Sequence, residues 1–186
     1  MSDILLIGPS FGGKTTMLYS YKGKKAPEGA TGKAGERVKT KGVLWTGLGG
    51  DEFKEIGGIM LHNDSCIDAI NHEPKRKILF IFDGTEFIKQ ALHPEEGGEI
   101  WARWLYYCSQ SKIQQREVHF VATHNDCTDG MNIKILECVR TANEEYASIL
   151  GGGAKRYDNI RFQEPYFHCI NAKSQEEVKR LFDKIR

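Results

Sequence analysis

The strongest chemical pattern in the sequence lies at its start, where residues 3–16 read DILLIGPSFGGKTT. Gly8, Gly13, Lys14 and Thr15 satisfy the spacing G-x-x-x-x-G-K-[ST] of a phosphate-binding loop. Glycines let the backbone wrap a phosphate with its N–H groups turned inward, and the N-terminus of a following helix attracts an anion. We therefore expect Lys14 to reach the outer phosphates of a nucleotide and Thr15 to offer its hydroxyl to Mg²⁺.

The residues on either side of this loop support the interpretation. Ile4–Ile7 is an apolar run long enough for a buried strand, and Thr15–Tyr19 can begin a helix, so the loop has the required context of strand, loop and helix. Phe11 is expected either to shield the phosphates or only to cover the loop. The phosphate contacts are expected from Gly8, Phe11, Gly12, Gly13, Lys14, Thr15 and Thr16.

Length and composition predict one globular domain over residues 1–186, because a chain of 186 residues can bury a sizeable core. A net charge of +1 argues against wholesale binding of nucleic acid or of a membrane surface. The five cysteines include no CxxC pair, which favours reduced thiols in a cytoplasmic protein. No apolar run approaches the roughly 18 residues of a membrane span, so we expect no intrinsic membrane anchor.

Apolar runs alternate with helical patterns along the rest of the chain. The runs expected to be strands are Val43–Trp45, Ile78–Phe82, Val118–Ala122 and Tyr166–Ile170, and the helical patterns fall within residues 66–71, 101–108, 135–149 and 174–185. Residues 22–41 and 47–58 are rich in glycine and are expected to be loops. The pattern predicts an α/β fold: a single P-loop NTPase domain with a mostly parallel six-stranded sheet and helices on both faces.

Ligands of such sheets bind beyond the carboxyl ends of the strands, which directs attention to two short segments. The segment THND follows the strand that ends at Ala122, and the segment NAK follows the strand that ends at Ile170. The carboxylate of Asp126 can accept hydrogen bonds from N1–H and the 2-amino group of guanine, a donor pair that adenine lacks. The N–H of Ala172 would then reach the guanine oxygen. The residues expected around the base are Thr123, His124, Asp126, Ala172 and Lys173.

With these motifs in this order, the chain resembles the Ras superfamily of small GTPases, most of all its Arf-like branch, over almost its whole length. GKTTMLYSYK (residues 13–22) looks like the Arf-family phosphate loop and first helix, and ILFIFDGTEF (residues 78–87) looks like the fourth strand of the family. THND resembles the guanine motif [NT]-K-x-D with histidine in place of lysine, and NAK resembles S-A-K. The long separation of these last two motifs is also similar to the β subunit of the signal-recognition-particle receptor.

The resemblance implies a D-x-x-G motif followed by a glutamine, and the chain departs from it. The best local match places Gly49 as the glycine that senses the γ-phosphate, with Thr46 in place of the magnesium-side aspartate and Asp51 in place of the glutamine. An alternative register uses Asp64 on the magnesium side. Since an aspartate does not orient an attacking water as glutamine does, slow or partner-dependent GTP hydrolysis is expected.

The resemblance also implies a switch threonine that closes the magnesium site, for which Thr31 is the first candidate and Thr40 the second. The implied function is a GTP/GDP molecular switch that binds guanine nucleotide, Mg²⁺ and a protein effector or regulator. Two other functions stay open. One is a degenerate GTPase fold that serves as an interaction subunit with a structural nucleotide or none. The other is a P-loop kinase, which the dispersed arginines do not favour.

Overall fold

The computed structural model describes residues 4–26, 43–46, 52–55, 64–72, 77–92, 100, 104, 107, 110–113, 116–124 and 166–185. Strands and helices alternate along these residues: β1 (Ile4–Ile7), α1 (Lys14–Tyr21), β2 (Val43–Thr46), β3 (Glu52–Glu55), α2 (Asp64–His72), β4 (Lys77–Asp83), α3 (Gly84–Leu92), β5 (Val118–Thr123), β6 (Phe167–Cys169) and α6 (Gln175–Ile185). Among these helices, none is both long enough and apolar enough to cross a membrane.

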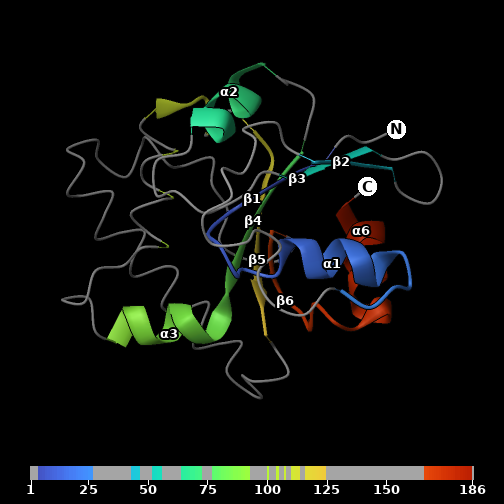
Figure 1. The fold of residues 1–186 in the computed structure, drawn as a ribbon. Helices are drawn as coiled ribbons and strands as arrows, with labels where there is room; N and C mark the ends of the chain where they lie inside the picture. Colours follow the sequence, from blue (N-terminus) through green and yellow to red (C-terminus); the bar gives the residue numbers. More distant parts are fainter. Residues whose placement is uncertain are drawn as a thin grey trace, which may run out of the picture.

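The six strands of the described residues form one sheet in the order β2-β3-β1-β4-β5-β6 (Figure 1). Neighbouring strands from β3 to β6 run parallel, and only the edge pair of β2 and β3 is antiparallel. Every residue of β1 and β5 is buried, as expected for parallel strands that are covered on both faces. The predicted α/β class and mostly parallel sheet are therefore confirmed.

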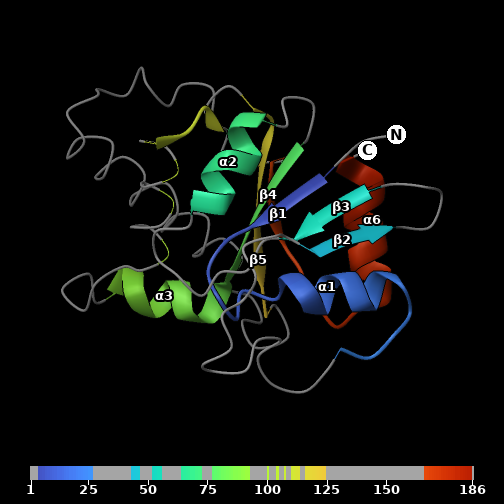
Figure 2. The ribbon, with the colours of Figure 1, turned by 45° about the horizontal axis from the view of Figure 1, so that its top comes forward.

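Helices cover both faces of this sheet, as Figure 2 shows, with α1 and α6 on one side and α2 and α3 on the other. Alternate residues of β4 point to opposite faces, so Phe80 packs with the α2 side and Leu79 with the α1 and α6 side. On the α2 side, the Phe80 ring lies 5.1 Å from Trp104 and 6.0 Å from Phe120, measured between ring centroids, in edge-on contacts. This double burial holds the ends of the central strands in place.

The last helix, α6, shows how the sequence pattern becomes packing. Its predicted apolar stripe consists of Val178, Leu181, Phe182 and Ile185, and all four are buried. Ser174 caps the helix, because its Oγ accepts the N–H of Glu177 at 3.3 Å. The Glu177 carboxylate in turn accepts the N–H of Asn171 at 2.8 Å, which ties the turn after β6 to the first turn of α6.

The strand β3 was not expected, since residues 47–58 were predicted to be a loop. Phe53 is the only apolar residue of EFKE, so the segment carries no strand pattern of its own and gains its structure from pairing with β1 and β2. Thr46 pairs with Glu52 at the amino end of β3, whereas the phosphate loop follows the carboxyl end of β1. The sequence left open whether Thr46 or Asp64 faces the magnesium, and this pairing places Thr46 at the end of the sheet opposite the phosphate loop.

Polar side chains contact one another at the end of the sheet where β4 and β5 begin, which we call the amino edge; the opposite end is the carboxyl edge. Lys77 Nζ lies 3.1 Å from the Glu117 carboxylate and donates to the carbonyl of Ile185 at 2.7 Å, near the last turn of α6. Because a carboxylate only accepts, the buried His119 donates from Nε2 to Glu117 at 2.9 Å. Its Nδ1 lies 3.0 Å from Nε2 of His168 on β6. These bonds satisfy polar groups that burial would otherwise make costly.

We predict that the contact between α1 and α6 carries much of the stability. Phe182 is fully buried and meets Tyr21 edge-on, with 5.0 Å between the ring centroids. Phe182→Ala should lower the free energy of unfolding by about 3–5 kcal/mol, because it leaves a cavity between helix and sheet. Arg180→Ala, on the exposed side of the same helix, should leave the stability close to wild type. Urea unfolding checks both variants, and equal stabilities would contradict this packing.

Candidate nucleotide-binding site

The phosphate loop joins β1 to α1 and crosses closely over the carboxyl end of β4. Gly8 has a φ of 134°, and a Cβ at this position would lie 2.0 Å from the carbonyl oxygen of Ile81. Gly13 has a φ of 90°, and a Cβ there would lie 3.0 Å from the side chain of Thr123. Both positions require glycine, because the loop passes so close to the neighbouring strands that no Cβ fits.

The N-terminus of α1 has no side-chain cap. Its N-cap residue is Gly13, which brings no side chain to the N–H groups of the first turn, and that turn holds no acidic residue. Thr15 and Thr16 lie in this turn and are half-buried. The N–H groups of a first turn without a side-chain cap, together with the helix dipole, make such an end a favourable place for an anion.

Lys14 lies inside the loop. Its side chain is buried, with 5% exposed, and Nζ donates to the carbonyls of Gly8 at 3.0 Å and Pro9 at 2.6 Å. The ammonium is thus held on the inner side of the loop by the loop's own carbonyl groups. Phe11 of the same loop is, by contrast, 74% exposed to solvent. Its backbone has a φ of 60°, a conformation that residues other than glycine rarely adopt.

Thr123, the last residue of β5, binds the phosphate loop directly. Its Oγ1 donates to the carbonyl of Gly12 at 2.9 Å, and the carbonyl of Phe82 lies 3.1 Å away. The same side chain lies against Gly13, where it would meet an added Cβ. The start of the THND segment and the phosphate loop are therefore in contact at one edge of the sheet, as the sequence predicted.

The turn of Asn171–Lys173 leaves the sheet at the same edge. Ile170 N donates to the carbonyl of Ala122 at 2.9 Å, so the turn begins beside the end of β5. Ala172 is buried in the cluster that contains Met17 of α1. Lys173 is exposed, and its N–H donates to Asn171 Oδ1 at 2.9 Å. The third predicted segment thus joins the first two.

The structure accounts for most of the predicted site residues. Those that it brings to the carboxyl edge of the sheet are Gly8, Phe11, Gly12, Gly13, Lys14, Thr15, Thr16, Thr123, His124, Ala172 and Lys173. Gly49, Thr31 and Asp126 lie outside the described residues.

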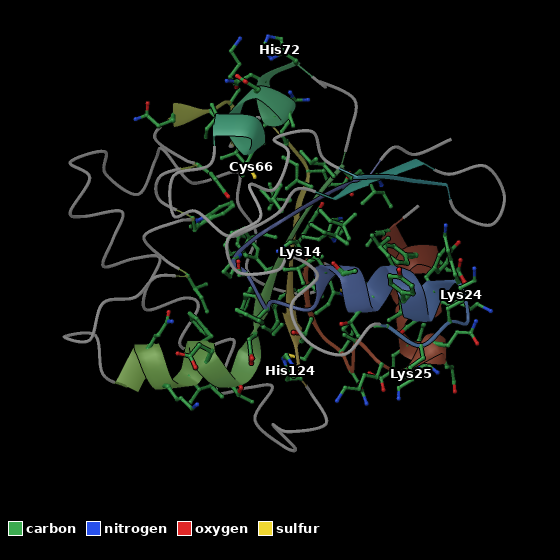
Figure 3. All side chains as sticks on the ribbon, viewed as in Figure 1. Lys14, Lys24, Lys25, Cys66, His72 and His124 are labelled. Carbon is green, nitrogen blue, oxygen red and sulfur yellow. The ribbon has the colours of Figure 1, made fainter. Side chains whose placement is uncertain are left out.

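Sequence reasoning missed one member of this edge, Asp83 at the end of β4. Its Oδ1 accepts the N–H of Thr85 at 2.8 Å, the Thr85 hydroxyl at 2.6 Å and the N–H of Glu86 at 3.2 Å, and so caps α3. Its Oδ2 lies 3.2 Å from Nδ1 of His124. Figure 3 shows His124 near the start of α3. The signal was present in the sequence, since an aspartate directly before a helix is a common N-cap.

The electrostatics of Asp83 follow from these contacts. Partial burial raises the pKa of this carboxyl group, but hydrogen bonds from His124 and Thr85 and the charge of His124 outweigh it and lower the pKa to about 2. The ionised form of Asp83 is therefore the one that the fold stabilises. Its stabilising contribution is present above the ordinary pKa of 3.8 and is lost as the pH falls through about 2.

We predict that Asp83 makes the protein sensitive to acid. Asp83→Asn keeps a side-chain cap for α3 but has no charge to lose, so its stability should change less between pH 4 and pH 2 than that of the wild type, by about 2 kcal/mol. The free energy of unfolding in urea at several pH values measures this difference. Asp68→Asn, an exposed position on α2, is the matched control and should keep the wild-type profile. Parallel profiles for Asp83→Asn and wild type would refute the assignment.

Comparisons with known proteins show the fold. No protein-family model matches the chain, and no curated protein does. Among solved structures, a probable GTP-binding protein EngB matches with a TM-score of 0.59 and 16% identity over 99% of this chain and 96% of that one. Era in complex with MgGDPNP and ribosomal RNA matches with a TM-score of 0.57 and 15% identity over 99% of this chain and 55% of that one. SsGBP in complex with GDP matches with a TM-score of 0.57 and 14% identity over 100% of this chain and 48% of that one.

The chain thus spans nearly all of the EngB structure but only about half of the other two. These likenesses, together with the sheet and the phosphate loop, show that this chain has an α/β fold of the P-loop GTPase type.

Proposed function

We propose that this protein binds GTP and GDP together with Mg²⁺ at the carboxyl edge of its sheet and acts as a molecular switch for a protein partner. The observation that carries the proposal is the hydrogen bond from Thr123 to Gly12, because it joins the phosphate loop to the segment expected to recognise the base. The similar solved structures support a guanine nucleotide, since Era was solved in complex with MgGDPNP and SsGBP in complex with GDP.

The described residues fit a bound phosphate. Ser10 Oγ is buried within the loop and has no hydrogen-bond partner among the described residues. Such a buried hydroxyl is costly unless a ligand or water satisfies it. The N-terminus of α1 has a glycine N-cap and no side-chain cap, so it suits an anion. Lys14 is already held at this loop, from which its ammonium can turn to the outer phosphates.

The turn after β6 fits the base. The N–H of Ala172 has no partner among the hydrogen bonds between described residues, and it stands at the edge that carries Thr123. This N–H would donate to the guanine oxygen, while the carboxylate of Asp126 would accept from N1–H and the 2-amino group. The proposal keeps His124 and Lys173 beside the base. It predicts no binding of nucleic acid, on the evidence of a net charge of +1.

The position of β3 suggests a new magnesium-side residue. Glu55 ends β3 at the register position of Leu6, close to the point where β1 enters the phosphate loop. In the sequence, Gly58 follows three positions later, which is the spacing of D-x-x-G with glutamate as the acid, and Ile59 stands where the glutamine is expected. We therefore assign Glu55 to the water shell of Mg²⁺. Thr15 and Thr31 would bind the ion through their hydroxyl groups. Because isoleucine cannot orient water, hydrolysis should be slow or depend on a partner.

The first experiment is to denature the purified protein and identify any released nucleotide by chromatography. Fluorescent GDP and ADP analogues then measure base preference in the emptied protein. Release of GDP or GTP, or tight binding of the GDP analogue, supports the proposal. Absence of both favours the interaction subunit without nucleotide, and preference for the adenine analogue favours the kinase alternative. The proposed likeness to the Arf-like branch rests on GKTTMLYSYK at residues 13–22 and ILFIFDGTEF at residues 78–87.

We predict that Asp126→Asn changes the base preference. An amide offers one acceptor and one donor, which matches xanthine better than guanine. GTP affinity should fall by about 10- to 100-fold, the range expected for a lost charge-assisted hydrogen bond, while affinity for xanthosine triphosphate rises. Competition against a fluorescent nucleotide measures both. Unchanged GTP affinity would remove Asp126 from the base site.

We predict that Glu55→Gln weakens the magnesium-dependent part of GTP binding by about tenfold, since a neutral amide holds the water shell less strongly than a carboxylate. Titrations with and without Mg²⁺ separate this part from the rest. Glu52→Gln, at the other end of the same strand, is the matched control and should bind like the wild type.

In single-turnover assays, wild-type hydrolysis should be slow, and a rate typical of an activated GTPase would contradict the role of Ile59.

A further inference from the structure

We propose that Asp83 is a positioning residue for base recognition, which acts through an ion pair with His124 and makes nucleotide binding depend on pH. The proposal rests on the proposed function, because it concerns how the same site holds the base. His124 stands where the small GTPases that the chain resembles carry a lysine, and Asp83 comes from a different strand. Neither residue needs to touch the nucleotide for the effect.

The two oxygens of the Asp83 carboxylate have separate tasks. Oδ1 accepts three hydrogen bonds from Thr85 and Glu86, so the first turn of α3 holds the carboxylate in one orientation. Oδ2 is thereby directed at Nδ1 of His124, 3.2 Å away. His124 is held by a carboxylate that is itself held by a helix, which makes the contact more rigid than an exposed ion pair.

His124 needs such a contact because of its backbone. Its φ of 61° is left-handed, which costs free energy in a residue other than glycine. The preceding residue, Thr123, is bound to the carbonyl of Gly12. The Thr123 Oγ1 also lies 3.1 Å from His124 Nδ1, so this N–H is shared between Asp83 and Thr123. Together the contacts set the direction in which the chain leaves β5, and Asp126 follows only two residues later.

The charge of His124 can change near neutral pH, because histidine ordinarily loses its proton near pH 6.5. A lysine at this position would keep its charge. Among the residues that the structure describes, Asp83 has its carboxylate 3.2 Å from His124 Nδ1. Among the other charged groups of the neighbouring elements, Glu86 and Lys89 of α3 pair with each other at 3.6 Å, and Lys14 is bound to loop carbonyls. Lys173 is exposed on the turn before α6. The ion pair is therefore complete at low pH and weakens as the pH rises.

The test is the dissociation rate of a fluorescent GDP analogue from the full chain between pH 5.5 and pH 8.5. In the wild type, dissociation should be about fivefold faster at the upper pH, as expected for the loss of a partly buried ion pair. His124→Lys keeps its charge over this range, so its rate should be slow and nearly flat, and the change of the nucleotide's own charge cancels in this comparison. Asp83→Asn should dissociate fast at every pH.

Thr85→Ala is the matched control. It removes one hydrogen bond to Oδ1 and weakens the cap of α3, but it leaves Oδ2 and His124 in place. Its rates should follow the wild-type profile even if the protein melts at a lower temperature. If Asp83→Asn behaves like Thr85→Ala, the role of Asp83 is structural and the proposal is overturned.

A measurement without nucleotide separates this proposal from the proposed function. Imidazole signals of His124, followed by NMR in the unliganded protein, should titrate at higher pH in the wild type than in Asp83→Asn. Equal titrations overturn the ion pair whatever the protein binds. Wild-type protein that binds no guanine nucleotide overturns the proposed function and the positioning role together. Binding with the same pH profile in wild type and His124→Lys overturns only the positioning role of Asp83.

Discussion

The site depends on one hydrogen bond, from the hydroxyl of Thr123 to the carbonyl of Gly12, at 2.9 Å. It joins residues 111 positions apart in the sequence: Thr123, the last residue of β5, and Gly12, in the loop between β1 and α1. Gly13 packs against the same threonine, so a larger residue at either position would push the loops apart. In the proposed nucleotide site, this contact would set the separation between the phosphate loop and the segment proposed to bind the base.

Such a contact is possible because the sheet is covered on both faces. Burial of β1, β4 and β5 keeps the carboxyl ends of these strands level, so loops that follow them must meet. The two edges of the sheet then differ in character. The amino edge is closed by Lys77, Glu117 and the last turn of α6, whereas the carboxyl edge carries an uncapped helix end, a buried hydroxyl without a partner among the described residues, and strained backbone. Strain of this kind collects at sites that bind ligands.

Asp83 and His124 show how a departure from a motif can be understood through its neighbours. A histidine in the guanine motif is only a substitution when seen alone. Asp83 contacts His124 with one oxygen and caps α3 with the other. His124 is thereby connected to the helix, at the point where the segment proposed to bind the base leaves β5. The contact helps to lower the pKa of Asp83, and it holds His124 in its left-handed backbone conformation.

Local sequence determined the phosphate loop, the buried strands and the apolar stripe of α6, because glycine spacing, continuous apolar runs and helical periodicity are properties of neighbouring residues. It also placed THND and NAK after strands, and topology then required them to converge. Only the tertiary structure decided that EFKE is a strand, since its pairing partners lie in β1 and in β2, and this pairing placed Thr46 at the end of the sheet opposite the phosphate loop. It alone joined Asp83 to His124, because a contact between the ends of two different strands leaves no periodic trace in the chain.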